Sequence, residues 1–181
     1  MRVITGSAKG RRLITLEGED IRPTAAKVKG AIFNSIQFDI EGRNVLDLFA
    51  GAGQLGIEAL SRGATSCVFV DSSKKSVRAV TTNVANCGFQ SQCKVITGDA
   101  LSYIKSCMQI FGIVFLDPPY GMKWIDKVLP FVTDHVSEGG IIVCETDLKE
   151  ELPDECNMFC VDRVRNYSHT KITIYRRKTL E

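Results

Sequence analysis

Four consecutive residues, Asp117-Pro118-Pro119-Tyr120, combine a carboxylate, a rigid turn and an aromatic ring. They follow the apolar run 113–116, which predicts a strand. An exocyclic amine on a nucleobase is a poor nucleophile because its lone pair is delocalised into the ring. Asp117 and the Pro118 carbonyl could accept its two N–H bonds and stabilise the positive charge that develops on the nitrogen. The prolines fix the backbone, and Tyr120 offers a face for base stacking. We therefore expect Asp117, Pro118 and Tyr120 to be catalytic in group transfer to a base.

A second motif, Gly51-Ala52-Gly53-Gln54-Leu55-Gly56, lies between a predicted strand over 45–49 and a predicted helix over 54–61. Asp71 follows Gly51 by twenty residues, at the end of the predicted strand 67–71. This pattern is the fingerprint of dinucleotide binding, spacing included. Taken alone it indicates a nicotinamide cofactor, so other residues must decide which cofactor binds.

Carboxylates near the glycine turn favour a cationic cofactor. Asp47 comes just before the turn, where a carboxylate would repel an anionic pyrophosphate. The methionine end of S-adenosylmethionine carries an ammonium and a sulfonium, which a carboxylate attracts. Asp99, in Gly98-Asp99-Ala100, follows the third predicted strand. Its carboxylate could accept a hydrogen bond from an adenine amino group or cap the following helix, and both interpretations stay open.

Both motifs lie at the ends of predicted strands, which indicates a sheet that presents them along one edge. Short apolar runs alternate with helical stretches between residues 45 and 145, a pattern typical of a parallel sheet with helices on both faces. Ligands of open α/β sheets bind at the carboxyl ends of the strands. The predicted strands span 45–49, 67–71, 94–97, 113–117, 140–145, 158–164 and 170–176, and the predicted helices span 24–36, 54–61, 73–87, a segment from 100 onward, and 124–135.

The two ends of the chain depart from this alternation. No helix separates the last two predicted strands, which indicates an antiparallel hairpin at one edge of the sheet. Segments 2–5 and 11–16 favour a small N-terminal hairpin, and Thr24 is the expected N-cap of the next helix, with Pro23 just outside it. We therefore expect a Rossmann-like α/β fold with a mostly parallel seven-stranded sheet and helices on both faces. It would form one domain over 1–178, with residues 1–20 as an N-terminal hairpin extension and 179–181 as a tail.

The composition is that of an ordinary globular protein and excludes several classes. The 181 residues are 44% hydrophobic and 24% charged, which suits one domain. No run of about 18 apolar residues and no signal peptide is present, so we expect a cytoplasmic protein without a membrane segment. Seven cysteines without C-x-x-C spacing and only two histidines give no expectation of a metal. Cys67 and Cys144 lie in apolar runs and should be core residues.

The charge is unevenly distributed although the net charge is only +2. Residues 1–30 hold seven Lys or Arg against three Asp or Glu, and residues 163–178 hold six against none. Residues 31–162 hold ten against seventeen. Solvated surface charge would explain this pattern, and so would a polyanion-binding face built from the two chain ends. The residues expected to contact the phosphates of such a polyanion are Arg11, Arg12, Lys27, Lys29, Arg163, Arg165 and Lys171.

With these motifs the chain resembles the class I methyltransferases that carry an (N/D)PP(Y/F) motif. Within them it resembles the small bacterial 16S rRNA guanine-N2 methyltransferases, often called the RsmD family. The resemblance covers essentially the whole chain. It rests on Arg2-Val3-Ile4-Thr5-Gly6, Gly10-Arg11-Arg12-Leu13, Ile21-Arg22-Pro23-Thr24, residues 46–53, residues 55–64, Asp117-Pro118-Pro119-Tyr120, and Thr170-Lys171-Ile172-Thr173-Ile174-Tyr175.

The resemblance implies S-adenosylmethionine as cofactor and ribosomal RNA, in an assembling small subunit, as partner. The chain departs from the family at Gly30, where a glutamate is usual, and at His169, where a small residue is common. The implied cofactor-binding residues are Phe49, Gly51 and Gly53 for the methionine portion, Asp71 for the ribose, Asp99 and Ala100 for the adenine, and Arg22 and Thr24 closing over the cofactor, with Asp117, Pro118 and Tyr120 handling the target guanine.

Three alternatives stay open at this point. A DNA adenine-N6 methyltransferase would use the same Asp117 chemistry, but such enzymes usually need a target-recognition domain. A nicotinamide-dependent oxidoreductase would fit the glycine motif, but Asp47 disfavours it and the Asp117 motif would be unexplained. A non-catalytic RNA-binding module would leave the catalytic motif without a use.

Overall fold

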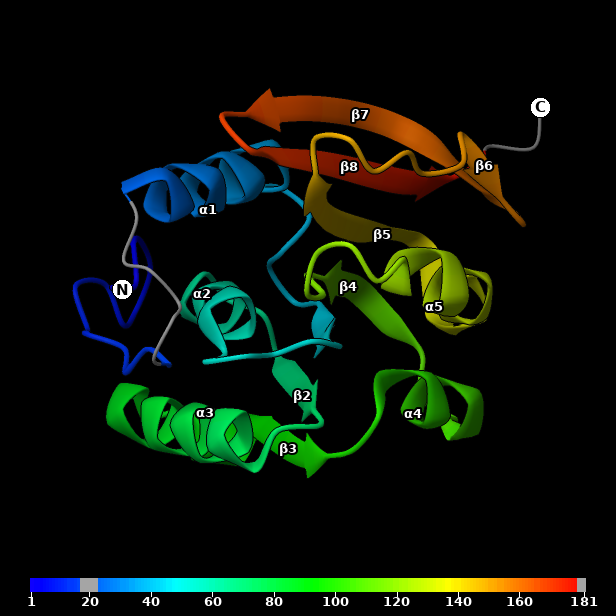
Figure 1. Ribbon diagram of the computed structural model, residues 1–181. Coiled ribbons are helices and arrows are strands. Elements are labelled where there is room, and N and C mark those ends of the chain that lie inside the picture. Colours follow the sequence, from blue (N-terminus) through cyan, green and yellow to red (C-terminus); the bar gives the residue numbers. More distant parts are fainter. Residues whose placement is uncertain (17–22, 179–181) are drawn as a thin grey trace.

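One mixed sheet forms the centre of the computed structural model, which describes residues 1–16 and 23–178, with the side chains of residues 23–25 excepted. In the described residues the strand order is β3-β2-β1-β4-β5-β8-β7-β6, parallel from β3 to β5 and antiparallel from β5 to β6 (Figure 1). The strands are β1 (Asn44–Asp47), β2 (Ser66–Asp71), β3 (Cys93–Thr97), β4 (Phe111–Leu116), β5 (Val136–Asp147), β6 (Glu155–Cys156), β7 (Phe159–Tyr167) and β8 (Thr170–Arg177).

The mostly parallel sheet and the C-terminal hairpin, formed by β7 and β8, are confirmed, but the expected number of seven strands is wrong. The additional strand, β6, has two residues and, among the described residues, pairs with one end of β7, through Glu155 with Cys160 and Cys156 with Phe159. A two-residue strand is too short to show an alternating pattern of apolar residues. The sequence therefore could not reveal it.

The helices begin and end close to their predicted positions. Ser73 caps α3 because its side chain accepts a hydrogen bond from the Ser76 amide, and Gly88, with φ 80°, ends this helix in the left-handed conformation. The prediction that Thr24 is an N-cap is wrong, because α1 already begins at Pro23, a residue favoured in the first turn of a helix. The helices are α1 (Pro23–Ser35), α2 (Gln54–Ser61), α3 (Lys74–Cys87), α4 (Ala100–Ser106) and α5 (Trp124–Val132), with 3₁₀ turns at Gln90–Gln92 and Thr133–His135.

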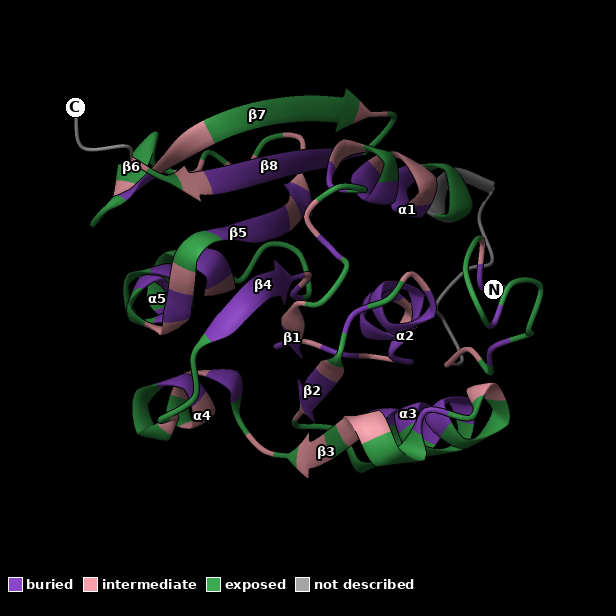
Figure 2. Ribbon diagram, turned by 180° about the vertical axis from the view of Figure 1, so that it is seen from behind, coloured by how far each residue is buried: buried purple, intermediate pink, exposed green. Residues whose placement is uncertain are grey.

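The helices cover both faces of the sheet, as expected. Every residue of β4 is buried, and its side chains alternate between the two faces. Ile113 and Phe115 pack with residues of α1, α2 and α3, whereas Val114 and Leu116 pack with residues of α4 and α5. Figure 2 shows these buried strands between the two groups of helices. The expected core positions of Cys67 and Cys144 are confirmed, since both are buried.

The N-terminal arm, residues 1–16, has much less regular structure than the predicted hairpin. One isolated antiparallel bridge joins Arg2 and Arg12. The Val3 amide donates to the Arg11 carbonyl at 3.0 Å, and the Gly10 amide donates to the Val3 carbonyl at 2.9 Å. The arm lies beside α2 and α3 (Figure 1). Among the described residues, no helix is long and apolar enough to cross a membrane.

Candidate active site

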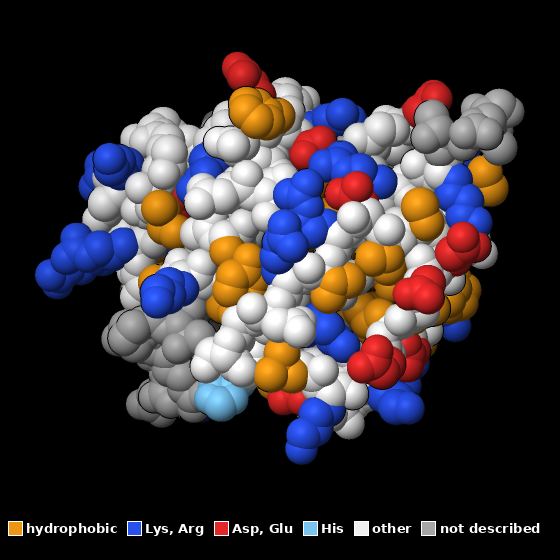
Figure 3. All heavy atoms as spheres, turned by 90° about the horizontal axis from the view of Figure 1, so that it is seen from above, with side chains coloured by type: hydrophobic (Ala, Val, Ile, Leu, Met, Phe, Trp, Pro, Cys, Tyr) orange, Lys and Arg blue, Asp and Glu red, His pale blue; other side chains and the backbone are white. Residues whose placement is uncertain are grey.

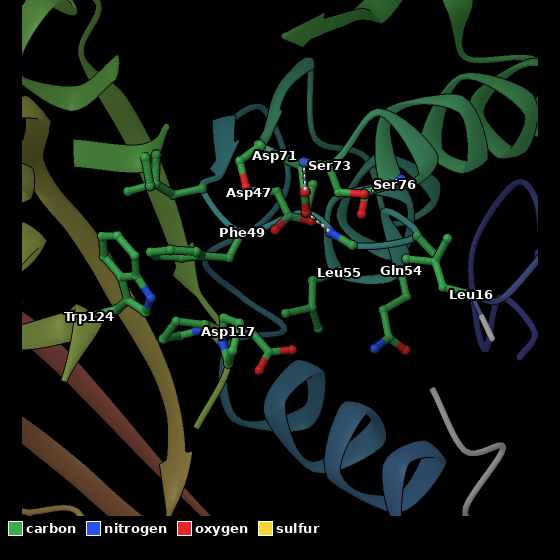
Figure 4. A pocket seen from close by; sticks show the side chains of 18 of the residues that line it. Leu16, Asp47, Phe49, Gln54, Leu55, Asp71, Ser73, Ser76, Asp117 and Trp124 are labelled. Atoms are coloured by element: carbon green, nitrogen blue, oxygen red, sulfur yellow. Dashed lines mark hydrogen bonds between the residues drawn. The ribbon is translucent and has the colours of Figure 1, made fainter. Parts of the chain in front are cut away.

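A cavity of about 780 Å³ opens at the carboxyl ends of four neighbouring parallel strands (Figure 4). The sheet order β3-β2-β1-β4 places one carboxylate at or just after each of these ends. The cavity wall also contains the glycine turn, Trp124 and part of the N-terminal arm. The four carboxylates that the fold brings together are Asp99, Asp71, Asp47 and Asp117.

The glycine turn is built for close approach of backbone to a ligand. Gly51 has φ 52° and Gly53 has φ 80°, values that side chains disfavour. A Cβ atom on Gly53 would come within 3.3 Å of Ile57 and Val80. Gly56 serves packing, because a Cβ atom there would lie 2.3 Å from the Phe69 ring. The sequence therefore needs these glycines both to form the turn and to dock α2 on β2.

Asp71 fixes the turn from the end of β2. Its Oδ2 atom accepts a hydrogen bond from the Gly51 amide at 2.8 Å, and its Oδ1 atom accepts one from the Ser73 amide at 2.8 Å. Each carboxylate oxygen can accept a further hydrogen bond. Asp71 also lines the cavity. It can therefore hold the turn and still receive hydroxyl donors from a ligand.

Asp47 is a buried carboxyl group at the floor of the cavity. Only 1% of its surface is exposed, and its Oδ2 atom accepts a hydrogen bond from the Gly56 amide at 3.1 Å. Burial raises its pKa to about 7, and the nearby Asp71 charge raises it further, although the Gly56 amide opposes the shift. A cation placed beside Asp47 would favour its ionised form. The site is thus suited to a positively charged ligand group.

Asp99 adopts one of the two roles left open by the sequence. It is the N-cap of α4, and its Oδ2 atom accepts a hydrogen bond from the Ser102 amide at 2.8 Å. This bond lowers the pKa of Asp99. Asp99 is exposed and lines the cavity beside the buried Ala100. Capping does not use all of its acceptor capacity, so an additional ligand contact is compatible with this geometry.

Two residues that the sequence did not single out complete this part of the cavity. The Trp124 ring packs against Phe49, with ring centroids 5.9 Å apart and planes tilted by 55° (Figure 4). Gln54 lines the cavity, and its Oε1 atom is buried without a hydrogen-bond partner among the described residues. Trp124 is the chain's single tryptophan and follows Tyr120 by four residues, which was the available signal for its role.

The Asp117 motif directly follows β4, as expected, and all four of its residues line the cavity. Pro118 is buried, whereas Tyr120 is 45% exposed. The Tyr120 hydroxyl donates to Glu145 at 3.2 Å and lies 3.0 Å from the Thr170 hydroxyl. Burial and the Glu145 charge raise the pKa of Tyr120, and burial raises the pKa of Glu145. The tyrosine is therefore anchored at its tip, as a neutral phenol, while its ring is open to a ligand.

Two of the predicted cofactor residues cannot be placed. Arg22 lies outside the described residues. Thr24 lies in α1, and its side chain is not described. Their closing over the cofactor stays a prediction.

Among the predicted phosphate contacts, Lys29 is contradicted by its burial, and Lys171 is little exposed and stays a prediction. Lys29 is 2% exposed, forms an ion pair with the buried Glu58 at 3.1 Å and donates to the Arg2 carbonyl at 2.7 Å. Burial lowers its pKa. Lys171 is 8% exposed and pairs with Glu151 at 3.4 Å. The Lys29 ammonium is therefore held within the protein, whereas the Lys171 ammonium pairs with an exposed glutamate.

The other predicted phosphate contacts are accessible. Figure 3 shows the side of the molecule that carries β7, where Lys and Arg side chains gather among scattered acidic ones. His169 is exposed as well. The accessible residues of the predicted set are Arg11, Arg12, Lys27, Arg163 and Arg165.

Comparison with known proteins identifies the family of this chain. The model of the family described as conserved hypothetical protein 95 matches residues 1–176. The chain is 38% identical to "Putative rRNA methyltransferase YlbH" of Bacillus subtilis (strain 168), over 98% of this chain and all of the relative. It is 32% identical to ribosomal RNA small subunit methyltransferase D of Haemophilus influenzae, over 84% of this chain and 81% of that protein.

The fold agrees with this assignment. A solved structure from Escherichia coli, "Putative methyltransferase yhhF", superposes with a TM-score of 0.88 at 26% identity, over 98% of each chain. The likeness therefore extends from the N-terminal arm to the C-terminal hairpin. The chain belongs to the conserved hypothetical protein 95 family, the RsmD family of class I methyltransferases.

Proposed function

We propose that this protein transfers a methyl group from S-adenosylmethionine to the exocyclic N2 amino group of a guanine in 16S ribosomal RNA. One observation carries the proposal: Asp117, Pro118 and Tyr120 line the same cavity as the glycine turn and the carboxylates of β1 and β2. A site for the methyl donor and a site for the amino group would therefore be adjacent. The names of the relatives in Bacillus subtilis and Haemophilus influenzae support ribosomal RNA as the substrate class.

The cavity fits S-adenosylmethionine in size and in chemistry. Its volume of about 780 Å³ is within the usual range for ligand pockets. Asp71 would accept hydrogen bonds from the ribose hydroxyls, Asp99 with Ala100 would contact the adenine, and Asp47 would lie near the cationic methionine end. Phe49, Gly51 and Gly53 would hold the methionine portion, with Arg22 and Thr24 closing over it. When bound, the cofactor supplies an electrophilic methyl group on a sulfonium.

The target end of the cavity would orient and activate the amine. Asp117 and the Pro118 carbonyl would accept the two N–H bonds, which aims the nitrogen lone pair into the cavity. The same acceptors would stabilise the positive charge that develops on the nitrogen. The exposed ring of Tyr120 would stack on the base, and its anchored hydroxyl fixes the direction of that face. The alkylated amine then releases a proton to water, so Asp117 need not remove it.

The substrate assignment is tested by the product. We expect ribosomal RNA from a deletion strain to lack one N2-methylguanosine, measured by mass spectrometry of nucleosides, and the restored gene to replace it. The purified protein should methylate small-subunit particles. Comparing the rates of methylation of these particles and of naked 16S RNA tests whether the assembling subunit is its partner. Appearance of N6-methyladenosine instead, or no change in any methylated nucleoside, would refute the guanine assignment.

A further inference from the structure

The N-terminal arm forms one wall of the cofactor cavity. Met1 and the segment 13–16 line it, opposite Trp124. Figure 4 shows Leu16 and Gln54 together on this side. Ile14 also lines the cavity, and 48% of its surface is exposed. The arm thus presents apolar surface that a bound ligand would cover.

Backbone hydrogen bonds cross the arm from Val3 to Arg11, from Gly10 to Val3 and from Leu13 to Met1, and side chains of two helices attach the arm to the rest of the protein. Glu58 accepts hydrogen bonds from the Ile4 and Thr5 amides at 2.8 and 3.0 Å. Ser61 accepts one from the Ala8 amide at 3.0 Å and donates to the Thr5 carbonyl. Both anchors belong to α2 and hold the part of the arm before residue 9. In the cavity-lining segment 13–16, the Leu13 amide donates to the Met1 carbonyl at 3.0 Å, and the segment is attached to the helices by a separate anchor.

Asn83 of α3 supplies that anchor. Its Oδ1 atom accepts a hydrogen bond from the Ile14 amide at 2.7 Å, and its Nδ2 atom donates to the Ile14 carbonyl at 2.9 Å. Nδ2 also donates to the Ala52 carbonyl at 2.9 Å. Ala52 lies between Gly51 and Gly53. One fully buried amide therefore joins the arm to the glycine turn across the end of the cavity.

We propose that Asn83 is a positioning residue for the cofactor, because it fixes the arm as the wall that covers bound S-adenosylmethionine. The inference rests on the proposed function and assigns a role to a side chain that does not itself line the cavity. A fully buried asparagine amide would cost stability without those three bonds. Its three partners are backbone groups of residues that line the cavity, so loss of the Asn83 amide should also weaken ligand binding.

The test compares Asn83→Ala with Ser61→Ala. Both substitutions remove a buried anchor of the same arm, but Ser61 holds residues 5–8, away from the cavity. We expect calorimetry with S-adenosylhomocysteine to show at least tenfold weaker binding for Asn83→Ala and less than twofold for Ser61→Ala. At saturating cofactor, kcat of Asn83→Ala should stay within about threefold of wild type. The substitution should instead raise the KM for the cofactor. Equal weakening by both variants would overturn the proposal.

Hydrogen exchange of the Ile14 amide gives a readout that needs no activity. In the wild type this amide should exchange slowly, and S-adenosylhomocysteine should slow it further; in Asn83→Ala it should exchange fast without ligand. If Asn83→Ala does not fold, Asn83→Asp replaces it, because the carboxylate still accepts from Ile14 but cannot donate to the two carbonyls. Binding as tight as wild type in that variant contradicts the inference. A wild type that fails to bind S-adenosylhomocysteine would instead refute the proposed function.

Discussion

The two halves of the cavity are built in different ways. In the half proposed to bind the cofactor, Asp47, Asp71 and Asp99 each accept hydrogen bonds from backbone amides of turns and helix ends. In the target half, Tyr120 is held by side chains of Glu145 and Thr170, which are 25 and 50 residues away in the sequence. The first half is therefore fixed by hydrogen bonds from backbone amides, and the second by side chains that the pairing of β5 with β8 brings together. Substitutions in the first half should change the affinity for the cofactor, and substitutions in the second half should change the rate of methyl transfer.

The largest expected effect is that of Asp117→Ala. The charge that Asp117 would stabilise exists only as the methyl group moves, so its loss should raise the barrier and leave ground-state binding intact. We expect a loss of about 2.7–4 kcal/mol, roughly a hundred- to a thousandfold in single-turnover transfer on small-subunit particles, by analogy with removal of one donor from an oxyanion hole. Asp117→Asn should be milder, because its amide oxygen still accepts one N–H bond. Near-normal transfer by Asp117→Ala would remove Asp117 from the mechanism.

Asp71→Ala should show the opposite behaviour. The substitution removes the acceptor of the Gly51 and Ser73 amides together with the proposed ribose contact. Losing hydrogen bonds to a charged acceptor costs about 1.5–3 kcal/mol, or roughly tenfold or more in affinity. Calorimetry with S-adenosylhomocysteine should therefore detect weaker binding. Unchanged affinity in Asp71→Ala would mean that the ribose lies elsewhere.

Asp47 predicts a pH dependence of cofactor binding. Since its pKa is about 7 in the ligand-free protein, the carboxyl group is largely protonated below that pH. A cationic ligand favours the ionised form, so binding should release a proton below this pH. The affinity should therefore rise with pH, by at most about tenfold per pH unit, and should level off above about pH 7. Calorimetry at pH 6 in two buffers of different ionisation enthalpy measures the released proton. Asp47→Asn, which can still accept from Gly56, should release none from this site.

The raised pKa of Asp47 also makes the stability of the folded protein depend on pH. Between the ordinary carboxyl pKa and about 7, the folded protein binds a proton that the unfolded chain does not. The contribution of Asp47 to the free energy of unfolding should therefore fall as pH rises through this window. Urea unfolding of the wild type and of Asp47→Asn at pH 5 and pH 7 checks the direction. If the free energy of unfolding fell equally between pH 5 and pH 7 in the wild type and in Asp47→Asn, the fall would be due to other groups.

A smaller effect is expected for Tyr120→Phe. The ring face remains, but the hydrogen bonds to Glu145 and Thr170 are removed, at about 0.5–1.5 kcal/mol per bond. We expect a several-fold loss in kcat/KM for the RNA and unchanged affinity for S-adenosylhomocysteine. Tyr120→Ala, which also removes stacking worth about 1–3 kcal/mol, should lose more. If Tyr120→Phe instead weakened cofactor binding, the separation into two halves would fail.

The smallest effects should come from single charges outside both halves. Replacing Arg163 or Arg165 by Gln should lower the slope of log affinity for RNA against log salt by about 0.7–0.9 for each phosphate that the arginine no longer neutralises. Lys27 on α1 offers the same test near the N-terminal arm. Filter binding at several salt concentrations measures the slope. Variants with the wild-type slope would indicate that these charges do not face the RNA.

Much of the site could be predicted because its pattern is local. The alternation of strands and helices implies a sheet whose carboxyl ends share one edge, so the glycine turn, Asp71, Asp99 and Asp117 had to come near one another. The chain ends were predicted less well. The expected N-terminal hairpin has one antiparallel bridge, between Arg2 and Arg12, with a few backbone hydrogen bonds around it, and side chains of α2 and α3 also hold this arm.

The sequence by itself determined the order of elements, the edge of the sheet that carries the chemistry and the residues of both motifs, since each depends on periodicity and spacing along the chain. Only the tertiary structure decided which partners meet across long separations: Glu145 and Thr170 with Tyr120, and Asn83 with the N-terminal arm. It also decided that Lys29 is buried against Glu58 and not on the surface. The physical reason is that a charge or an amide has the same sequence signature whether its helix face docks against the protein or faces solvent.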